Sequence, residues 1–215
     1  MIKYSKIGKR TWVHLKRCFC DDLTALQTAK ATGLNRNTIN RYYRIFREKI
    51  ARHQESVSGG FSGQVELDES YFGGRNKGRR GRGTEKIPVF GIKKRNGRVY
   101  TQIIKNATSA EIRPIIKEFV RKGSTVYTDG WRAYDSLVLD GYKHFRINHQ
   151  QFQYSNRKGA HVNGIENFWS YAKRRLAKFN GIRAKDFYLH LKETEFRYNE
   201  KPNLYQKLSL ILKIF

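Results

Sequence analysis

Three short acidic motifs interrupt hydrophobic segments of a strongly basic chain. Of its 215 residues, 44 are basic and 18 are acidic, and the formal net charge is +26. A carboxylate in a hydrophobic segment costs several kcal/mol unless it is paired or metal-bound, so each one needs a role there. The motifs are Val65-Glu66-Leu67-Asp68-Glu69, Tyr127-Thr128-Asp129-Gly130 and Asn163-Gly164-Ile165-Glu166-Asn167.

These motifs supply the ligands of a candidate metal site. Carboxylate oxygens bind hard divalent cations such as Mg²⁺ and Mn²⁺ and leave positions open for water and phosphate oxygens. Two ions about 4 Å apart stabilise the attacking and the leaving oxygen of a phosphodiester displacement. We therefore predict that Asp68, Asp129 and Glu166 hold two Mg²⁺ or Mn²⁺ ions and act on nucleic acid.

Two predicted strands carry the aspartates. Residues 65–72 alternate between apolar and polar side chains, which places Asp68 in mid-strand on the same face as Glu66. Asp129 follows a short apolar strand at residues 125–127. Neighbouring strands would bring the two carboxylates together.

A helix predicted for residues 162–179 carries the third carboxylate. Ser170 and Lys173 follow Glu166 by four and seven residues, so the three side chains share one helix face. We expect Lys173 to lie beside the metal ions and to face the substrate phosphate. The alternative is a solvated glutamate paired with Lys173 or Ser170.

The aspartates also have simpler interpretations. Asp129 precedes Gly130, as an ordinary turn aspartate does. Asp68 is harder to explain in this way, because its strand is otherwise apolar. Glu66 and Glu69 remain rivals for the role of Asp68.

The first fifty residues have the proportions of a helix-turn-helix. Helices are predicted at residues 25–32 and 36–49, with Gly33 in the turn and Asn35 as the cap of the second helix. A plain three-helix unit with a basic face is the alternative. The polar residues suited to phosphates and base edges are Arg36, Asn37, Thr38, Asn40 and Arg41.

The pattern changes after a Gly- and Ser-rich segment. We predict a helix-turn-helix domain at residues 1–53, a linker at 54–63 and a catalytic α/β domain at 64–215. Strands at 87–93 and 98–104 extend the first strand into an antiparallel set.

A helix predicted for residues 109–120 follows this set. Pro114 fits that helix only if it lies close to the helix start. A further strand is predicted at residues 142–147.

The charge of the chain predicts a polyanionic partner. A sequence pI near 10.3 favours nucleic acid, with binding that weakens as salt rises. An anionic membrane is the rival partner, but no stretch approaches the ~20 apolar residues of a membrane span, and no secretory signal begins the sequence. We expect a cytoplasmic protein that binds nucleic acid. Cys18 and Cys20 form a lone pair without further zinc ligands, so reduced thiols are expected.

Basic residues outside the helix-turn-helix are also predicted to contact DNA. Five of them lie in a Gly-rich loop between the first two strands, and two lie late in the helix that carries Glu166. They are Arg75, Lys77, Arg79, Arg80, Arg82, Arg174 and Lys178.

Four longer motifs carry a resemblance to a known family. They are Val65-Glu-Leu-Asp-Glu-Ser-Tyr-Phe-Gly-Gly74, Pro88-Val-Phe-Gly-Ile92, Val126-Tyr-Thr-Asp-Gly-Trp-Arg-Ala-Tyr134 and His161-Val-Asn-Gly-Ile-Glu-Asn-Phe-Trp-Ser-Tyr-Ala-Lys-Arg-Arg175. From about residue 64 to about residue 200, the chain resembles the transposase domain of ISXO-like bacterial insertion sequences.

The resemblance implies an RNase H-like mixed sheet flanked by helices. It also implies a DDE transposase that cuts at transposon ends and joins the freed 3′-hydroxyl to target DNA. Asp68, Asp129 and Glu166 would be the acidic triad, and Lys173 the basic residue that follows it. Pairing of two transposon ends implies a homodimer or a larger homo-oligomer on DNA, and the family implies a location in the bacterial cytoplasm, associated with the nucleoid.

Two other functions remain open from the sequence. One is a non-catalytic DNA-binding regulator derived from a transposase. The other is a related metal-dependent nuclease without a joining step, which would use the same carboxylates.

Overall fold

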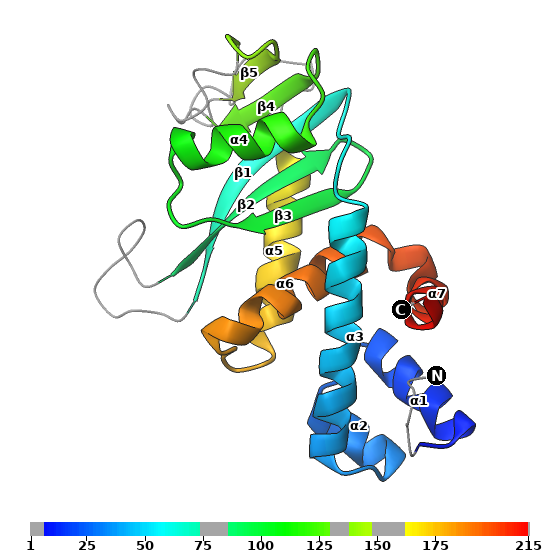
Figure 1. The fold of residues 1–215 in the computed structure, drawn as a ribbon. Helices are drawn as coiled ribbons and strands as arrows, with labels where there is room; N and C mark the ends of the chain where they lie inside the picture. The colour runs from blue at the N-terminus through cyan, green and yellow to red at the C-terminus, as the bar shows by residue number, and fades with distance from the viewer. Residues whose placement is uncertain (1–6, 74–85, 130–137, 148–161, 215) are drawn as a thin grey trace. The chain divides into compact units, whose positions relative to one another are not determined.

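The computed structural model describes residues 7–73, 86–129, 138–147 and 162–214 (Figure 1). The chain divides into two compact units. The helical unit combines Met1–Val57 with Ile182–Phe215, and the sheet unit is Ser58–Gly181. The middle of the chain therefore forms one unit and its two ends form the other.

The helical unit begins with α1 (Lys9–Cys20), α2 (Ala25–Thr32) and α3 (Arg36–Ser56). Gly33 ends α2 in the left-handed conformation with φ 70°, and the Asn35 side chain accepts a hydrogen bond from the Asn37 N–H at 2.8 Å. The predicted helices and turn are confirmed. Helix α3, however, continues beyond residue 49 through the first residues of the expected linker.

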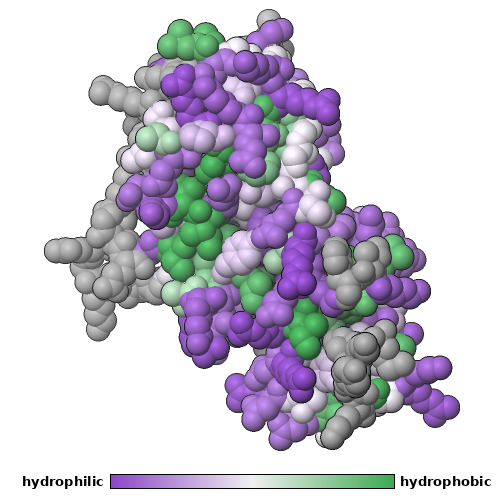
Figure 2. All heavy atoms as spheres, viewed as in Figure 1, coloured by the Kyte–Doolittle hydropathy of each residue, from purple (hydrophilic) through white to green (hydrophobic). Residues whose placement is uncertain are grey.

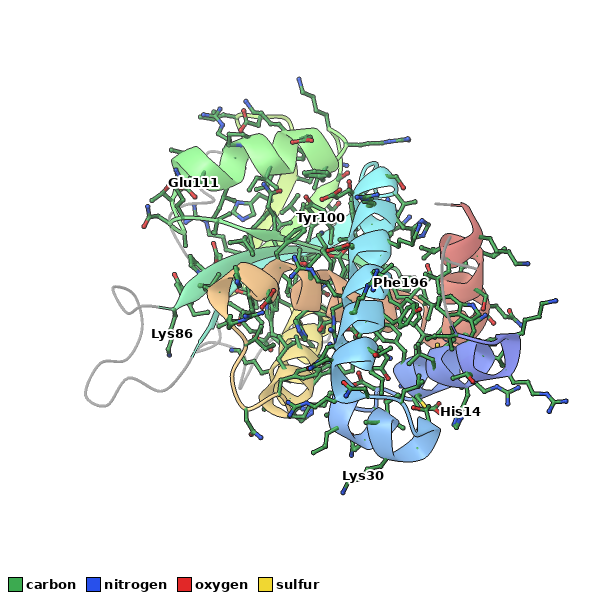
Figure 3. All side chains as sticks on the ribbon, turned by 60° about the horizontal axis from the view of Figure 1, so that its bottom comes forward. His14, Lys30, Lys86, Tyr100, Glu111 and Phe196 are labelled. Carbon is green, nitrogen blue, oxygen red and sulfur yellow. The ribbon has the colours of Figure 1, made fainter. Side chains whose placement is uncertain are left out.

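Three C-terminal elements complete this unit: α6 (Ala184–Asn199), the 3₁₀ helix η2 (Lys201–Asn203) and α7 (Leu204–Ile214). Phe196 lies within its core (Figure 3). The other core residues are Trp12, Leu15, Phe19, Ile39, Tyr42, Tyr43, Phe46, Ile50, Leu208, Ile211 and Leu212.

This division differs from the sequence-based one, which grouped all residues after 63. The apolar faces of α6 and α7 pack into the core of the N-terminal helices, which α1, α2 and α3 alone would leave partly exposed. Buried ion pairs join the same helices: Glu193 of α6 lies 2.6 Å from the Arg47 Nε of α3 and 2.8 Å from the Arg197 Nε.

The sheet unit contains one mixed five-stranded sheet in the order β3-β2-β1-β4-β5 (Figure 1). Its antiparallel part comprises β1 (Gln64–Phe72), β2 (Ile87–Lys94) and β3 (Val99–Ile103). On the other side of β1 follow two parallel strands, β4 (Thr125–Asp129) and β5 (Lys143–Ile147). Strand β1 is therefore central, and the predicted α/β class with a mixed sheet is confirmed.

Helices cover both faces of this sheet, with α4 (Ser109–Phe119) on one and α5 (Asn163–Ala177) on the other (Figure 1). Val65 and Leu67 of β1 belong to the core on the α4 face. The alternating side chains of β1 face α5. Pro114 is the sixth residue of α4, further from the helix start than expected.

No helix in the described ranges is both long enough and apolar enough to cross a membrane. The two cysteines are free thiols, as expected, and burial raises the pKa of Cys20 to about 11. Hydrophilic residues cover most of the face shown in Figure 2.

Candidate metal centre

Strands β1 and β4 bring the two candidate aspartates to the same face of the sheet. The strands pair in parallel, and their last pair joins Glu66 to Tyr127. Asp68 and Asp129 each lie two residues beyond that pair, so both side chains point to the face of Glu66. Adjacent strands lie about 5 Å apart. The register therefore places the two carboxylates on one face of the sheet, just beyond the point where the pairing ends.

Asp68 is held by two hydrogen bonds. The Trp169 Nε1–H of α5 donates to Oδ2 at 3.1 Å, and the Glu69 N–H donates to Oδ1 at 2.8 Å. Asp68 pairs across the sheet with Gly91 of β2. A Cβ at Gly91 would lie 2.5 Å from the Trp169 Cζ2 and 2.9 Å from the Ile165 Cδ1, so α5 packs directly onto this glycine.

Burial and nearby negative charge raise the pKa of Asp68 from 3.8 to about 7. Desolvation is the largest cause, and the charges of Asp129 and Glu166 raise the pKa further. The hydrogen bonds from Glu69 and Trp169 act in the opposite direction. The three candidate carboxylates thus share one electrostatic environment, in which a bound cation would relieve the repulsion.

The third carboxylate enters from the first turns of α5. Glu166 is the fourth residue of that helix and is exposed to solvent. Glu66, by contrast, is 1% exposed, and it accepts hydrogen bonds from the Ile165 N–H at 2.9 Å and the Arg95 Nε–H at 3.1 Å. These bonds hold Glu66 in the contact between α5 and the sheet. Asp68 rather than Glu66 is therefore the candidate metal ligand on β1.

The carboxylates are coupled, but they are not arranged as a preformed set of ligands. In the described part of the chain, no three His, Cys, Asp or Glu residues are grouped closely enough to hold a metal ion. The convergence of Asp68, Asp129 and Glu166 on one point therefore stays a prediction. The donor chemistry still fits a hard divalent cation, since all three groups offer carboxylate oxygens.

The basic residues of α5 and of its C-cap differ in exposure. Lys173, two turns after Glu166, and Arg174 are exposed. Lys178 is half-buried with its Nζ 5.1 Å from the centre of the Phe179 ring, and Arg175 is buried. Lys173 and Arg174 are therefore open to a phosphate backbone.

The other candidate DNA contacts fall into two groups. At the start of α3, Arg36, Asn37, Asn40 and Arg41 are exposed, whereas Thr38 is half-buried. The candidates of the Gly-rich loop lie outside the described residues. They are Arg75, Lys77, Arg79, Arg80 and Arg82.

Three residues of the site were not predicted from the sequence. Trp169 was not predicted to belong to the site, although its indole N–H donates a hydrogen bond to Asp68. Gly91 and Arg95 gave no signal as members of the site. Gly91 contacts α5, and Arg95 forms an ion pair with Glu66. Both contacts depend on segments that lie far apart in the sequence, so neither could be predicted from it.

Comparison with known proteins agrees with the resemblance of the sequence motifs to ISXO-like transposases. The ISXO2-like transposase domain matches residues 60–199. An uncharacterized transposase-like protein of Haemophilus influenzae is 49% identical over 102 residues, which cover 47% of this chain and 81% of that protein. An uncharacterized protein in the transposable element ISH50 of Halobacterium salinarum is 32% identical over 161 residues, which cover 66% of this chain and 54% of that protein.

Solved structures give a weaker likeness. A pre-cleavage Mos1 transpososome has a TM-score of 0.29 at 11% identity, covering 97% of this chain and 80% of that chain. A Mos1 paired-end complex with the left transposon end has a TM-score of 0.30 at 12% identity and the same coverage. These scores are too low to support an inference about fold or function. The match over residues 60–199 is sufficient by itself: the chain belongs to the family of the ISXO2-like transposase domain.

Proposed function

We propose that this protein is a metal-dependent DNA transposase that cuts transposon ends and joins them to target DNA. The observation that carries the proposal is the placement of Asp68 and Asp129 on one face of β1 and β4, where Trp169 of α5 binds Asp68, in a chain of a transposase family. Neighbouring carboxylates repel one another unless a cation offsets their charge. Binding of a divalent cation would give these three carboxylates a use.

The proposed reaction consists of two phosphodiester displacements at one site. Water attacks the phosphorus at the transposon end, the bond to the 3′-oxygen breaks, and a 3′-hydroxyl is released. That hydroxyl then attacks a phosphorus of the target strand, and the 3′-oxygen of the target leaves. One or two Mg²⁺ or Mn²⁺ ions would stabilise the attacking and leaving oxygens.

The side chains of the protein have separate roles in this proposal. Asp68, Asp129 and Glu166 would hold the ions. The hydrogen bond from Trp169 fixes the orientation of the Asp68 carboxylate. Lys173 would contact a phosphate of the bound strand, because it is exposed two turns along α5 from Glu166.

The helical unit is proposed to bind the transposon ends. The exposed polar side chains at the start of α3 suit the major groove and the phosphates beside it. Arg174, Lys178 and the Gly-rich loop would add phosphate contacts. Two ends must be held together, so we propose a homodimer or larger homo-oligomer on DNA, acting in the bacterial cytoplasm.

A strand-transfer assay tests this function. The protein is incubated with Mg²⁺ or Mn²⁺, labelled DNA that carries the element's own ends, and a target plasmid. The expected products are nicked ends and joined molecules, both abolished by EDTA. Cleavage without joining would support the nuclease instead, and DNA binding without cleavage in either metal would support the regulator.

A further inference from the structure

The first turn of α5 receives a hydrogen-bond acceptor from the sheet. The first N–H groups of a helix have no partner within the helix, and the side chain of the N-cap residue Val162 has no acceptor to offer. The Glu66 Oε2 of β1 accepts the Ile165 N–H at 2.9 Å instead. A residue 99 positions earlier in the chain therefore caps this helix.

Glu66 is itself fixed from the opposite side. Its Oε1 accepts the Arg95 Nε–H at 3.1 Å, and the Arg95 guanidinium lies 3.7 Å from the centre of the Tyr127 ring of β4. Arg95 also donates to the Gln64 side chain at 3.1 Å. The buried carboxylate thus joins the helix start to β1, to the end of β2 and to β4.

Gly164 allows the helix to approach this closely. A Cβ at Gly164 would lie 2.7 Å from the Glu66 Oε2 and 2.9 Å from the Lys93 Cε. Since atoms cannot come so close, a side chain at this position would displace the helix start or the ends of the Glu66 and Lys93 side chains, and either shift would disturb the contact. Gly164 thus leaves the space that the Glu66 carboxylate occupies beside the helix start.

This contact lies close in sequence to two of the proposed metal ligands, Glu166 and Asp68. Ile165, whose N–H is bound, directly precedes Glu166, and Glu66 lies two residues before Asp68 on the same strand face. We propose that Glu66 is a positioning residue, which holds the first turn of α5 on β1 and so sets Glu166 at the distance from Asp68 that metal binding requires. The proposal rests on the proposed function, because it assumes that Asp68 and Glu166 bind the same ion.

A direct test measures the helix contact and metal binding without DNA. Glu66→Ala removes the acceptor, whereas Glu66→Gln keeps a carbonyl oxygen that can accept the Ile165 N–H. Hydrogen exchange of peptides spanning Ile165 reports the contact, and calorimetric titration with Mn²⁺ reports the site. Glu111→Ala is the matched control, because Glu111 of α4 also accepts backbone N–H groups, from Lys105 and Asn106 (Figure 3).

In Glu66→Ala we expect faster exchange at Ile165 and a Kd for Mn²⁺ that rises about 10- to 100-fold, the range for residues that orient metal ligands. Glu66→Gln should recover most of both properties, and Glu111→Ala should bind Mn²⁺ as the wild type does. A purely structural glutamate would lower the melting temperature and leave the Kd of the folded protein unchanged.

Wild-type Mn²⁺ affinity in folded Glu66→Ala would overturn the proposal, as would a Glu66→Gln variant that behaves like the alanine. If Glu66→Ala does not fold, Gly164→Ala decides: it keeps the Glu66 residue but disturbs its contact with the helix start, and it must also weaken Mn²⁺ binding. Mn²⁺ binding that depends on Glu66, in a protein that cuts no DNA, would contradict the proposed reaction alone.

Discussion

Trp169 donates its indole N–H to Asp68 at 3.1 Å and so links the helix that carries Glu166 to the central strand. The same indole is 4% exposed, and it meets the Phe72 ring edge-on with centroids 5.9 Å apart. One side chain therefore packs α5 on the sheet and orients a candidate metal ligand.

Replacement of this tryptophan should separate the two roles. Trp169→Phe keeps an aromatic ring in the interface but removes the donor to Asp68. We expect Mn²⁺ affinity and DNA cleavage to fall about tenfold, since outer-shell hydrogen bonds to metal ligands have effects of that size. Trp12→Phe, in the core of the helical unit, is the control and should leave both unchanged. Unaltered Mn²⁺ binding in Trp169→Phe would show that the hydrogen bond has no part in the site.

The raised pKa of Asp68 predicts how stability depends on pH. Its pKa is about 7 in the folded protein and 3.8 as the ordinary value, so the folded state binds the proton more tightly. Stability that comes from the protonated carboxyl is present below about pH 4 and is lost as pH rises through 7. In EDTA, Asp68→Asn should therefore be more stable than the wild type at pH 8, by on the order of 1–4 kcal/mol, and close to it at pH 4.

Urea unfolding of both proteins between pH 4 and pH 8 measures this difference. A wild type that is the more stable protein at pH 8 without metal would contradict the pKa direction. Addition of Mg²⁺ at pH 8 should stabilise the wild type more than Asp68→Asn, because a ligand stabilises the folded form that binds it.

Gly91 is the position where α5 contacts β2 most closely. Gly91→Ala would place a Cβ 2.5 Å from the Trp169 Cζ2, so the helix or the strand must shift. We expect a loss of about 1–3 kcal/mol in the free energy of unfolding, as for other overpacked cores, together with weaker Mn²⁺ binding. Gly59→Ala has no atom within 4 Å of the added Cβ and should be nearly neutral. Equal stability of the two variants would argue against the close contact.

The start of α3 should control binding to transposon ends. Arg36→Ala and Arg41→Ala each remove an exposed cation, so affinity should fall, and the slope of log K against log salt should become shallower by about one for each phosphate that is no longer neutralised. Anisotropy titrations at increasing KCl measure both quantities. Lys213→Ala, an exposed position of α7, is the control. A salt dependence unchanged in both arginine variants would remove α3 from the DNA interface.

Local signals made the helix-turn-helix and the strands predictable. Asn35 caps its own helix, and Gly33 adopts the left-handed turn within the same short segment. The alternation in β1 likewise predicted that Glu66 and Asp68 share a face. These features depend on residues that are near in sequence.

Long-range partners could not be predicted in this way. An apolar face at Phe196 or Leu208 indicates burial but not the surface that it meets, and both residues join the N-terminal helices. Alternation alone also could not decide whether Glu66 or Asp68 is the candidate ligand. That distinction comes from the Ile165 N–H and the Trp169 indole, which reach β1 from a helix about a hundred residues later.

Metal-dependent cleavage by charge-neutral variants tests the central claim most directly. Asp68→Asn, Asp129→Asn and Glu166→Gln each remove one proposed ligand charge with little change in shape, and Glu111→Gln is the control outside the site. With Mg²⁺ and end DNA, we predict that each triad variant cuts at least ~100-fold more slowly than the wild type while it still binds DNA, because the ions stabilise the reacting oxygens. Wild-type cleavage rates in the three variants would contradict the assignment of these carboxylates as metal ligands.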